Sequence, residues 1–171
     1  IERAMDIYHQ HDCVVISDEI WSDIILPGHK HIPTQSVSED ARMRTVALYA
    51  PSKTFNLAGL VGSYHIIYNE MLRDRVCAVS NKTHYNEMNV LSMHALIGAY
   101  QPQGYEWVDE LNQVLAGNIE YFCDYVDEHF EGVSYSRPQG TYMVFLDCTE
   151  WCREHGRDIQ WLLDEGARVG V

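Results

Sequence analysis

The fold class of this chain follows from residues 45–60, TVALYAPSKTFNLAGL. The stretch opens with an apolar run, which is typical of a strand buried in a sheet. A polar cluster, Ser52-Lys53-Thr54, comes directly after it, and Gly59 indicates a tight link to the next segment. This pattern predicts a strand that delivers polar side chains to the edge of a sheet, where open α/β sheets place their chemistry.

The same arrangement occurs upstream. Residues 13–16, CVVI, form a short apolar run that predicts a strand buried on both faces, and Ser17-Asp18-Glu19 follow it. A third strand is predicted over residues 63–68, after Gly62. Because buried apolar strands joined by helices favour parallel pairing, we predict an α/β fold with a largely parallel sheet.

Helical patterns account for much of the remaining chain. The longest has apolar residues three or four positions apart from Tyr105 to Phe130, which predicts an amphipathic helix that ends at Gly132. Other helices are predicted over residues 1–11, 69–83, 86–100 and 158–165, with Asn86 as a helix cap, and strands over residues 133–137 and 141–147.

These elements predict three parts of the chain. Residues 1–103 alternate strand and helix and belong to a large α/β domain. Residues 104–130 form a long connecting helix, and residues 131–171 begin a smaller α+β domain. The chain opens inside a helical pattern and closes on residues 167–171, ARVGV, which resemble an unfinished strand. We therefore expect it to be a piece of a longer protein.

Composition restricts the possible partners. Of the 171 residues, 46% are hydrophobic, and the net charge is -13. That charge argues against nucleic acid or an anionic membrane as a partner, and no apolar stretch approaches the roughly 18 residues that span a bilayer. The five sparsely placed cysteines do not form a disulfide framework, so we expect a cytoplasmic protein.

Two motifs together resemble a known family. Residues 17–21, SDEIW, and residues 50–60, APSKTFNLAGL, resemble the fold-type I aminotransferase superfamily (class I and II) of pyridoxal-phosphate (PLP) enzymes. Within it, the chain looks most similar to the MalY/PatB group of cystathionine β-lyases. The likeness continues through residues 138–142, PQGTY, and residues 145–147, FLD, and so covers nearly the whole chain. It implies part of the PLP-binding large domain and the start of the small C-terminal domain.

The resemblance assigns roles to individual residues. It implies that Lys53 forms an imine with the PLP aldehyde and later removes the substrate Cα proton, which requires an unprotonated amine. It also implies that Asp18 pairs with the pyridine nitrogen and that Ser52 contacts the phosphate. Trp21 stands where a Tyr or His often contacts the cofactor's phenolic oxygen, and an indole N–H can only donate. Val61 stands where many aminotransferases have a phosphate-binding Arg.

The resemblance implies a carbon–sulfur β-lyase that converts cysteine thioethers to thiol, pyruvate and ammonia. The same residues would also serve an aminotransferase that acts on an amino acid, or a regulator that senses PLP without turnover. We expect a small amino-acid substrate and a homodimer. Because the remaining phosphate donors and the Arg for the substrate carboxylate are expected outside these 171 residues, we expect the chain alone to be inactive.

Other candidate residues favour structural roles. Cys148, Cys152 and His155 have loosely metal-like spacing, but no second ligand pair stands nearby, so we expect packing and no metal. His29 and His31 are interpreted as surface residues rather than as ligands. Tyr64 is expected to pack its ring in a strand, although it could line the pocket. The segment Tyr85-Asn86 could instead belong to a substrate loop.

Overall fold

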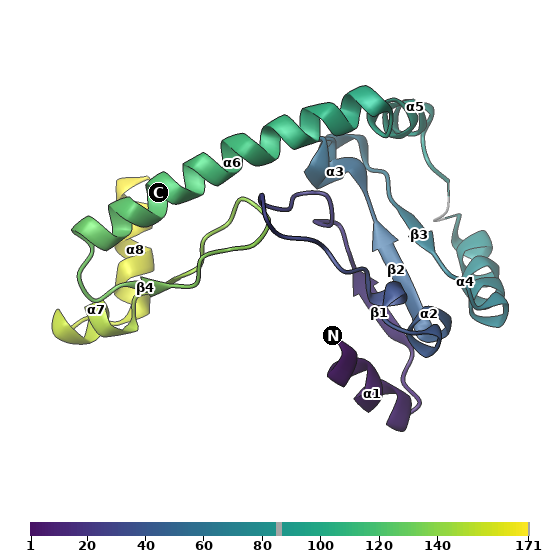
Figure 1. Ribbon diagram of the computed structural model, residues 1–171, viewed down its shortest axis with the longest axis horizontal. Coiled ribbons are helices and arrows are strands. Elements are labelled where there is room, and N and C mark those ends of the chain that lie inside the picture. Colours follow the sequence, from purple (N-terminus) through teal and green to yellow (C-terminus); the bar gives the residue numbers. More distant parts are fainter. Residues whose placement is uncertain (85–86, 171) are drawn as a thin grey trace.

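The computed structural model describes residues 1–84 and 87–170 (Figure 1). The predictions for Tyr85 and Asn86 lie outside the described residues, as does Val171 at the end of the predicted strand.

A three-stranded sheet lies in the N-terminal part of the chain. Its strands are β1 (Val15–Asp18), β2 (Thr45–Tyr49) and β3 (Tyr64–Ile66), in the order β1-β2-β3. β1 and β2 are parallel, with Asp18 opposite Leu48, whereas β2 and β3 are antiparallel. The α/β prediction is confirmed. The sheet is mixed because a short link returns the chain to β3 from the edge where β2 ends.

One face of β1 differs from the prediction. The run at residues 13–16 was expected to be buried on both sides, yet Ile16 is 72% exposed and Val14 is also exposed. Side chains alternate along a strand, and the side chains of Val15 and Ser17 on the other face are half-buried. The prediction was wrong because, in the described part of the chain, only one face of β1 is covered.

Helices fill most of the remaining chain, and several begin at a side chain that caps them. Ser38, Asn69 and Asn89 accept hydrogen bonds from the amides of Ala41, Leu72 and Ser92. None of the described helices is long and apolar enough to cross a membrane. The helices are α1 (Glu2–Gln10), η1 (Thr34–Ser36), α2 (Glu39–Arg44), α3 (Pro51–Thr54), η2 (Ala58–Leu60), α4 (Glu70–Thr83), α5 (Val90–Ala99), α6 (Pro102–His129), α7 (Thr149–Glu154) and α8 (Ile159–Val169).

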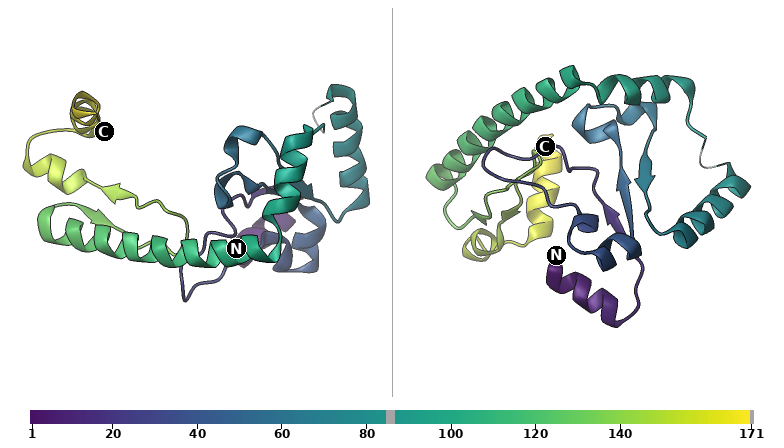
Figure 2. Two further views of the ribbon diagram at one scale, coloured as in Figure 1. Left: turned by 90° about the horizontal axis from the view of Figure 1, so that it is seen from above. Right: turned by 45° about the vertical axis from the view of Figure 1, so that its right-hand side comes forward.

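The long helix α6 connects the sheet to the C-terminal elements. It runs from beside α3 and α5 to the end of the molecule that carries α7 and α8 (Figures 1 and 2). This confirms the helix predicted over residues 104–130. The three-part domain division remains a prediction.

The C-terminal strands are shorter than predicted. β4 (Ser134–Tyr135) and β5 (Leu146–Asp147) form a two-stranded antiparallel pair. The strand predicted at residues 167–171 was wrong over its described residues, because α8 continues to Val169 and ends at Gly170, whose φ is 88°.

Two distant segments join between the sheet and the C-terminal elements, and we call residues 24–26 together with residues 139–141 the strap. The amide of Leu26 donates to the carbonyl of Gln139 at 3.0 Å, and the amide of Thr141 donates to the carbonyl of Ile24 at 2.8 Å. A Cβ on Gly140 would lie 2.8 Å from the Ile24 oxygen, so the close approach requires glycine. Residues 139–141 thus pair with residues 24–26 and do not extend β4 or β5.

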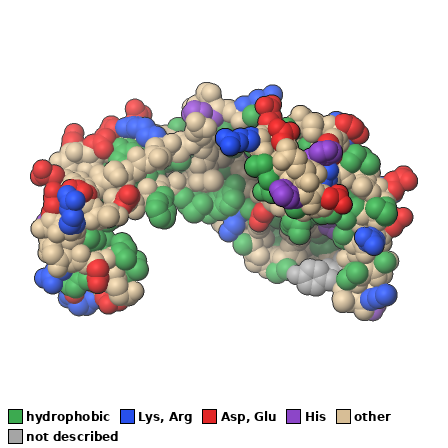
Figure 3. All heavy atoms as spheres, turned by 90° about the horizontal axis from the view of Figure 1, so that it is seen from below, with side chains coloured by type: hydrophobic (Ala, Val, Ile, Leu, Met, Phe, Trp, Pro, Cys, Tyr) green, Lys and Arg blue, Asp and Glu red, His purple; other side chains and the backbone are tan. Residues whose placement is uncertain are grey.

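The strap also borders the main apolar cluster. Leu26 packs there with Ile119 and Cys123 of α6, and Tyr135 and Val144 lie against them. Hydrophobic side chains also gather along the hollowed face of the molecule (Figure 3).

Candidate active site

Lys53 is carried by a single helical turn at the end of β2. β2 ends at Tyr49, Ala50 is the N-cap, and Pro51 occupies the start of α3. Proline is common at the first position of a helix. Its fixed φ is helical, and an N–H at that position would have no partner within the helix. The turn α3, which contains Lys53, lies just beyond the carboxyl end of β2 (Figure 1).

The Lys53 amine lies against an aromatic ring. Its Nζ is 5.3 Å from the ring centroid of Trp21, and the Trp21 ring is edge-on to Tyr142 with centroids 4.9 Å apart. Within residues 1–84 and 87–170, Lys53 forms no ion pair or side-chain hydrogen bond. Among the described residues, no polar side chain therefore occupies the amine, and it is available for chemistry.

A hydrogen bond next to Lys53 links α3 to the segment after β1. Thr54, which is buried, donates from Oγ1 to Asp23 Oδ2 at 3.0 Å, and Asn112 of α6 donates to the Asp23 carbonyl at 3.1 Å. The contacts among Thr54, Asp23 and Asn112 were not predicted from the sequence. The signal that could have indicated them was a threonine directly after Lys53 and an aspartate two residues after Trp21 in an otherwise apolar stretch.

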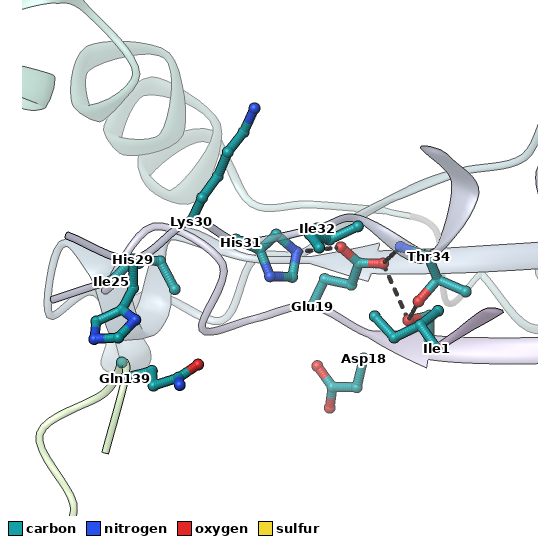
Figure 4. Close-up of a pocket in the computed structure, with 12 residues that line it drawn as sticks. Ile1, Asp18, Glu19, Ile25, His29, Lys30, His31, Ile32, Thr34 and Gln139 are labelled. Atoms are coloured by element: carbon teal, nitrogen blue, oxygen red, sulfur yellow. Dashed lines mark hydrogen bonds and ion pairs between the residues drawn. The ribbon is translucent and has the colours of Figure 1, made fainter. Parts of the chain in front are cut away.

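Asp18 lies at the carboxyl end of β1. Since β1 and β2 are parallel, Asp18 and the residues that follow β2 come to the same edge of the sheet. Its side chain accepts only the Ile20 amide, at 3.2 Å, among the interactions of the described residues. It points away from the Glu19–His31 pair (Figure 4) and lines a cavity of about 340 Å³ together with His29 and Gln139.

The four predicted site residues are only partly brought together. Trp21 contacts Lys53 directly. In the described part of the chain, no hydrogen bond or ion pair joins Lys53 to Asp18 or Ser52, and Lys53 does not line the cavity of Asp18. Ser52 is half-buried next to Lys53 on α3. The assignment of Asp18 and Ser52 to the cofactor therefore stays a prediction.

Glu19, a buried carboxylate, follows β1 and lies on the side of the strand end opposite to Asp18 (Figure 4). Glu19, only 5% exposed, accepts hydrogen bonds from His31 at 2.7 Å, from the Thr34 amide at 2.9 Å, from Ser17 at 3.0 Å and from Tyr49 at 3.2 Å. The interpretation of His31 as a surface residue was wrong, because this bond holds it half-buried (Figure 4).

The contacts of Glu19 change its pKa and that of Tyr49. Burial opposes ionisation of Glu19, but the hydrogen bonds from His31, Thr34 and Ser17 outweigh it and hold the pKa of Glu19 below its usual value. Burial and the nearby charge of Glu19 raise the pKa of Tyr49. The network therefore keeps Glu19 ionised and Tyr49 protonated near neutral pH.

Aromatic rings pack beside α3. Tyr64 stacks on Tyr49 with centroids 5.4 Å apart and meets Tyr100 edge-on at 6.0 Å. Phe55, which follows α3, packs edge-on to Tyr100 at 5.2 Å and stacks near Trp107 at 6.2 Å. Tyr64 therefore packs its ring in the strand, as expected, and links the sheet to the helices.

The residues with metal-like spacing take packing positions. Cys152 is buried, Cys148 is half-buried, and the His155 ring stacks on Trp151 at 4.2 Å. The described residues contain no group of three side chains that could hold a metal ion.

Comparison with known proteins identifies the family. The sequence model for aminotransferase class I and II matches residues 1–169. The chain belongs to this family. It is 32% identical over 157 residues to cystathionine β-lyase PatB of Bacillus subtilis, and 36% identical over 148 residues to protein MalY of Escherichia coli. These matches cover 92% and 86% of this chain, and they confirm the predicted likeness to the MalY/PatB group.

The fold agrees with a solved structure of the family. Cystalysin from Treponema denticola, whose structure contains pyridoxal 5'-phosphate, matches 96% of this chain with a TM-score of 0.86 at 28% identity. The match covers 41% of the cystalysin chain, and the chain spans 40% of PatB and 37% of MalY.

Proposed function

We propose that this chain is part of a PLP-dependent carbon–sulfur β-lyase of the cystathionine β-lyase type, which eliminates a thiol from cysteine thioethers and releases pyruvate and ammonia. One observation carries the proposal: the Lys53 amine lies on the turn after β2 against the Trp21 ring, and none of the described residues forms an ion pair or hydrogen bond with it. The similarity to PatB, whose name states this activity, supports the choice of reaction.

The side chains present fit PLP by their chemistry. A primary amine suits the aldehyde, and Lys53 would provide it. A carboxylate suits the ring nitrogen, and Asp18 is exposed at the sheet edge, where the Ile20 amide is its one hydrogen-bond partner among the described residues. The Ser52 hydroxyl would contribute to holding the phosphate. When bound, PLP supplies an electron sink for the electron pair left at the substrate Cα.

The work of the protein lies in proton transfer and placement. Lys53 acts as a base only while its amine is neutral. After Lys53 has taken the Cα proton, the face of Trp21 stabilises the resulting ammonium by a cation–π contact. Asp18, at the carboxyl end of β1, would hold a proton on a facing ring nitrogen.

An aminotransferase is the second candidate, because the matching family is aminotransferase class I and II. Both reactions begin with removal of the same Cα proton. They differ in the next step, since elimination needs a leaving group on Cβ and transamination needs a keto acid as acceptor. Products therefore discriminate between the two.

The test uses the whole protein incubated with PLP. Borohydride reduction followed by peptide mass spectrometry is expected to find a pyridoxyl group on Lys53, and cystathionine is expected to yield pyruvate and thiol. Lys53→Ala should abolish both results. Lys82→Ala, which removes an exposed lysine of α4, is the matched control and should leave both unchanged. Labelling elsewhere than Lys53 would overturn the proposal, whereas amino transfer to a keto acid without pyruvate would favour the aminotransferase.

We further propose a cytoplasmic homodimer that acts on an amino acid. The five cysteines are all free, which suits a reducing compartment. Large hydrophobic side chains such as Leu91, Val114 and Tyr121 are exposed, which suits burial against further polypeptide.

A further inference from the structure

Two aromatic rings from distant parts of the sequence stand beside the Lys53 amine. Trp21 follows β1, and its ring centroid is 5.3 Å from Lys53 Nζ. Tyr142 lies before β5, and its ring meets Trp21 edge-on, with the planes at 73°. Tyr142 remains 50% exposed, so one side of this pair is open to another molecule.

The strap holds Tyr142 in this place. Thr141, the residue before it, donates its amide to the Ile24 carbonyl at 2.8 Å. Thr141 also has a φ of 65°, a conformation that residues other than glycine rarely adopt, and its hydroxyl accepts the Met143 amide at 3.2 Å. Hydrogen bonds of Thr141 and Met143 therefore hold the backbone on both sides of Tyr142. This backbone places the Tyr142 ring against Trp21.

The chemistry of this pair favours some side chains over others. Aromatic faces attract apolar groups and the polarisable sulfur of a thioether. A carboxylate gains nothing from such a face. In the described part of the chain, Lys53 is the only cation against either ring, and its amine is engaged in the reaction.

We infer that Tyr142 is a specificity-determining residue of the Lys53 site, and that with Trp21 it forms an aromatic wall that selects amino acids with apolar or thioether side chains against those with a carboxylate where the thioether sulfur would lie. The inference rests on the proposed function, because a substrate whose Cα proton goes to Lys53 brings its side chain close to these rings.

The test uses a step that needs no leaving group. The whole protein, loaded with PLP in heavy water, is given methionine or glutamate, which have similar length but carry a thioether or a carboxylate. Exchange of the Cα proton for deuterium is measured by NMR as kcat/KM. The wild type is expected to prefer methionine by about tenfold or more, and Tyr142→Ala to reduce that preference about tenfold, mainly through KM for methionine.

Further variants separate recognition from folding. Tyr142→Phe keeps the ring and should retain the preference, whereas Tyr142→Arg offers a partner to a carboxylate and should shift the preference toward glutamate. Tyr8→Ala removes an exposed tyrosine of α1 and serves as the control. An unchanged methionine preference in Tyr142→Ala and Tyr142→Arg would overturn the inference while leaving the proposed function intact. Absence of exchange in the wild type, with no pyridoxyl group on Lys53, would instead overturn the proposed function.

Discussion

At the scale of single residues, the hydrogen bond from Thr54 to Asp23 controls the placement of Lys53. Thr54→Val keeps the shape of the side chain but removes the donor, so the turn loses its link to the segment after β1. We expect the unfolding free energy to fall by about 1–2 kcal/mol and the rate of PLP attachment to Lys53 to fall several-fold. Chemical denaturation and borohydride trapping measure the two effects.

Thr54→Ser provides the matched control, because it keeps the hydroxyl. Equal trapping rates in Thr54→Val and the wild type would show that the bond does not position Lys53.

Glu19 gives the molecule a pH-dependent part of its stability. Folding lowers the pKa of Glu19 from its ordinary value of 4.5, so the folded chain binds that proton less tightly than the unfolded chain. Ionised Glu19 therefore adds stability above pH 4.5, and this contribution is lost as the pH falls through the folded-state pKa. Glu19→Gln should cost about 2 kcal/mol at neutral pH and progressively less in acid.

Urea unfolding at several pH values measures this difference. Glu120→Gln, at an exposed position of α6, should show no such trend. A constant gap between Glu19→Gln and the wild type from neutral pH to about pH 3 would contradict the assignment.

The residue-level chemistry was partly readable from the sequence. Lys53 could be found because a strand, a polar cluster and a glycine-rich link surround it. Asp23, Thr54 and the Glu19 network could not, since their roles depend on contacts between residues far apart in the sequence.

At the scale of elements, the strap requires glycine at position 140. A Cβ there would overlap the Ile24 carbonyl oxygen at 2.8 Å, so Gly140→Ala should force the two segments apart. We expect a loss of about 1–3 kcal/mol in unfolding free energy, in the range of other overpacked sites. Gly117→Ala is the control, because open space surrounds that position in α6 and alanine favours a helix. Thermal or urea unfolding compares the two, and equal stabilities would contradict the role of the strap.

Elements with a strong repeat were predictable, and elements made by backbone pairing were not. The spacing of apolar residues predicted α6 within two residues at its start, because burial along one face imposes that spacing. The strap uses amides and carbonyls, which leave no side-chain pattern. The pairing of its two segments was therefore not predicted, and the strands predicted over residues 133–137 and 141–147 are longer than β4 and β5.

At the scale of the whole molecule, the burial of the five cysteines makes their thiols probes of local and global unfolding. Cys77 is exposed, Cys13 and Cys148 are half-buried, and Cys123 and Cys152 are buried. In the 171-residue chain, a maleimide pulse should modify Cys77 first and Cys123 last, because Cys123 lies in the cluster that joins α6 to the strap. Peptide mass spectrometry after timed quenching gives the order. Early modification of Cys123 would contradict the packing of α6 against the strap.

The fold class was predictable from the sequence, but which faces of the sheet are covered was not. Apolar runs predicted an α/β fold, yet they could not show that Ile16 would be exposed, since a sequence pattern states what a strand is suited to pack against and not what is present to cover it.

The strap has a consequence for how the protein is made. Ribosomes release the chain from its N-terminus, so the lysine on α3 emerges well before the tyrosine that completes its aromatic surroundings. During that interval the Tyr142 ring cannot yet meet Trp21. On the inference drawn for Tyr142, selectivity therefore arises only after residues 139–141 have paired with residues 24–26.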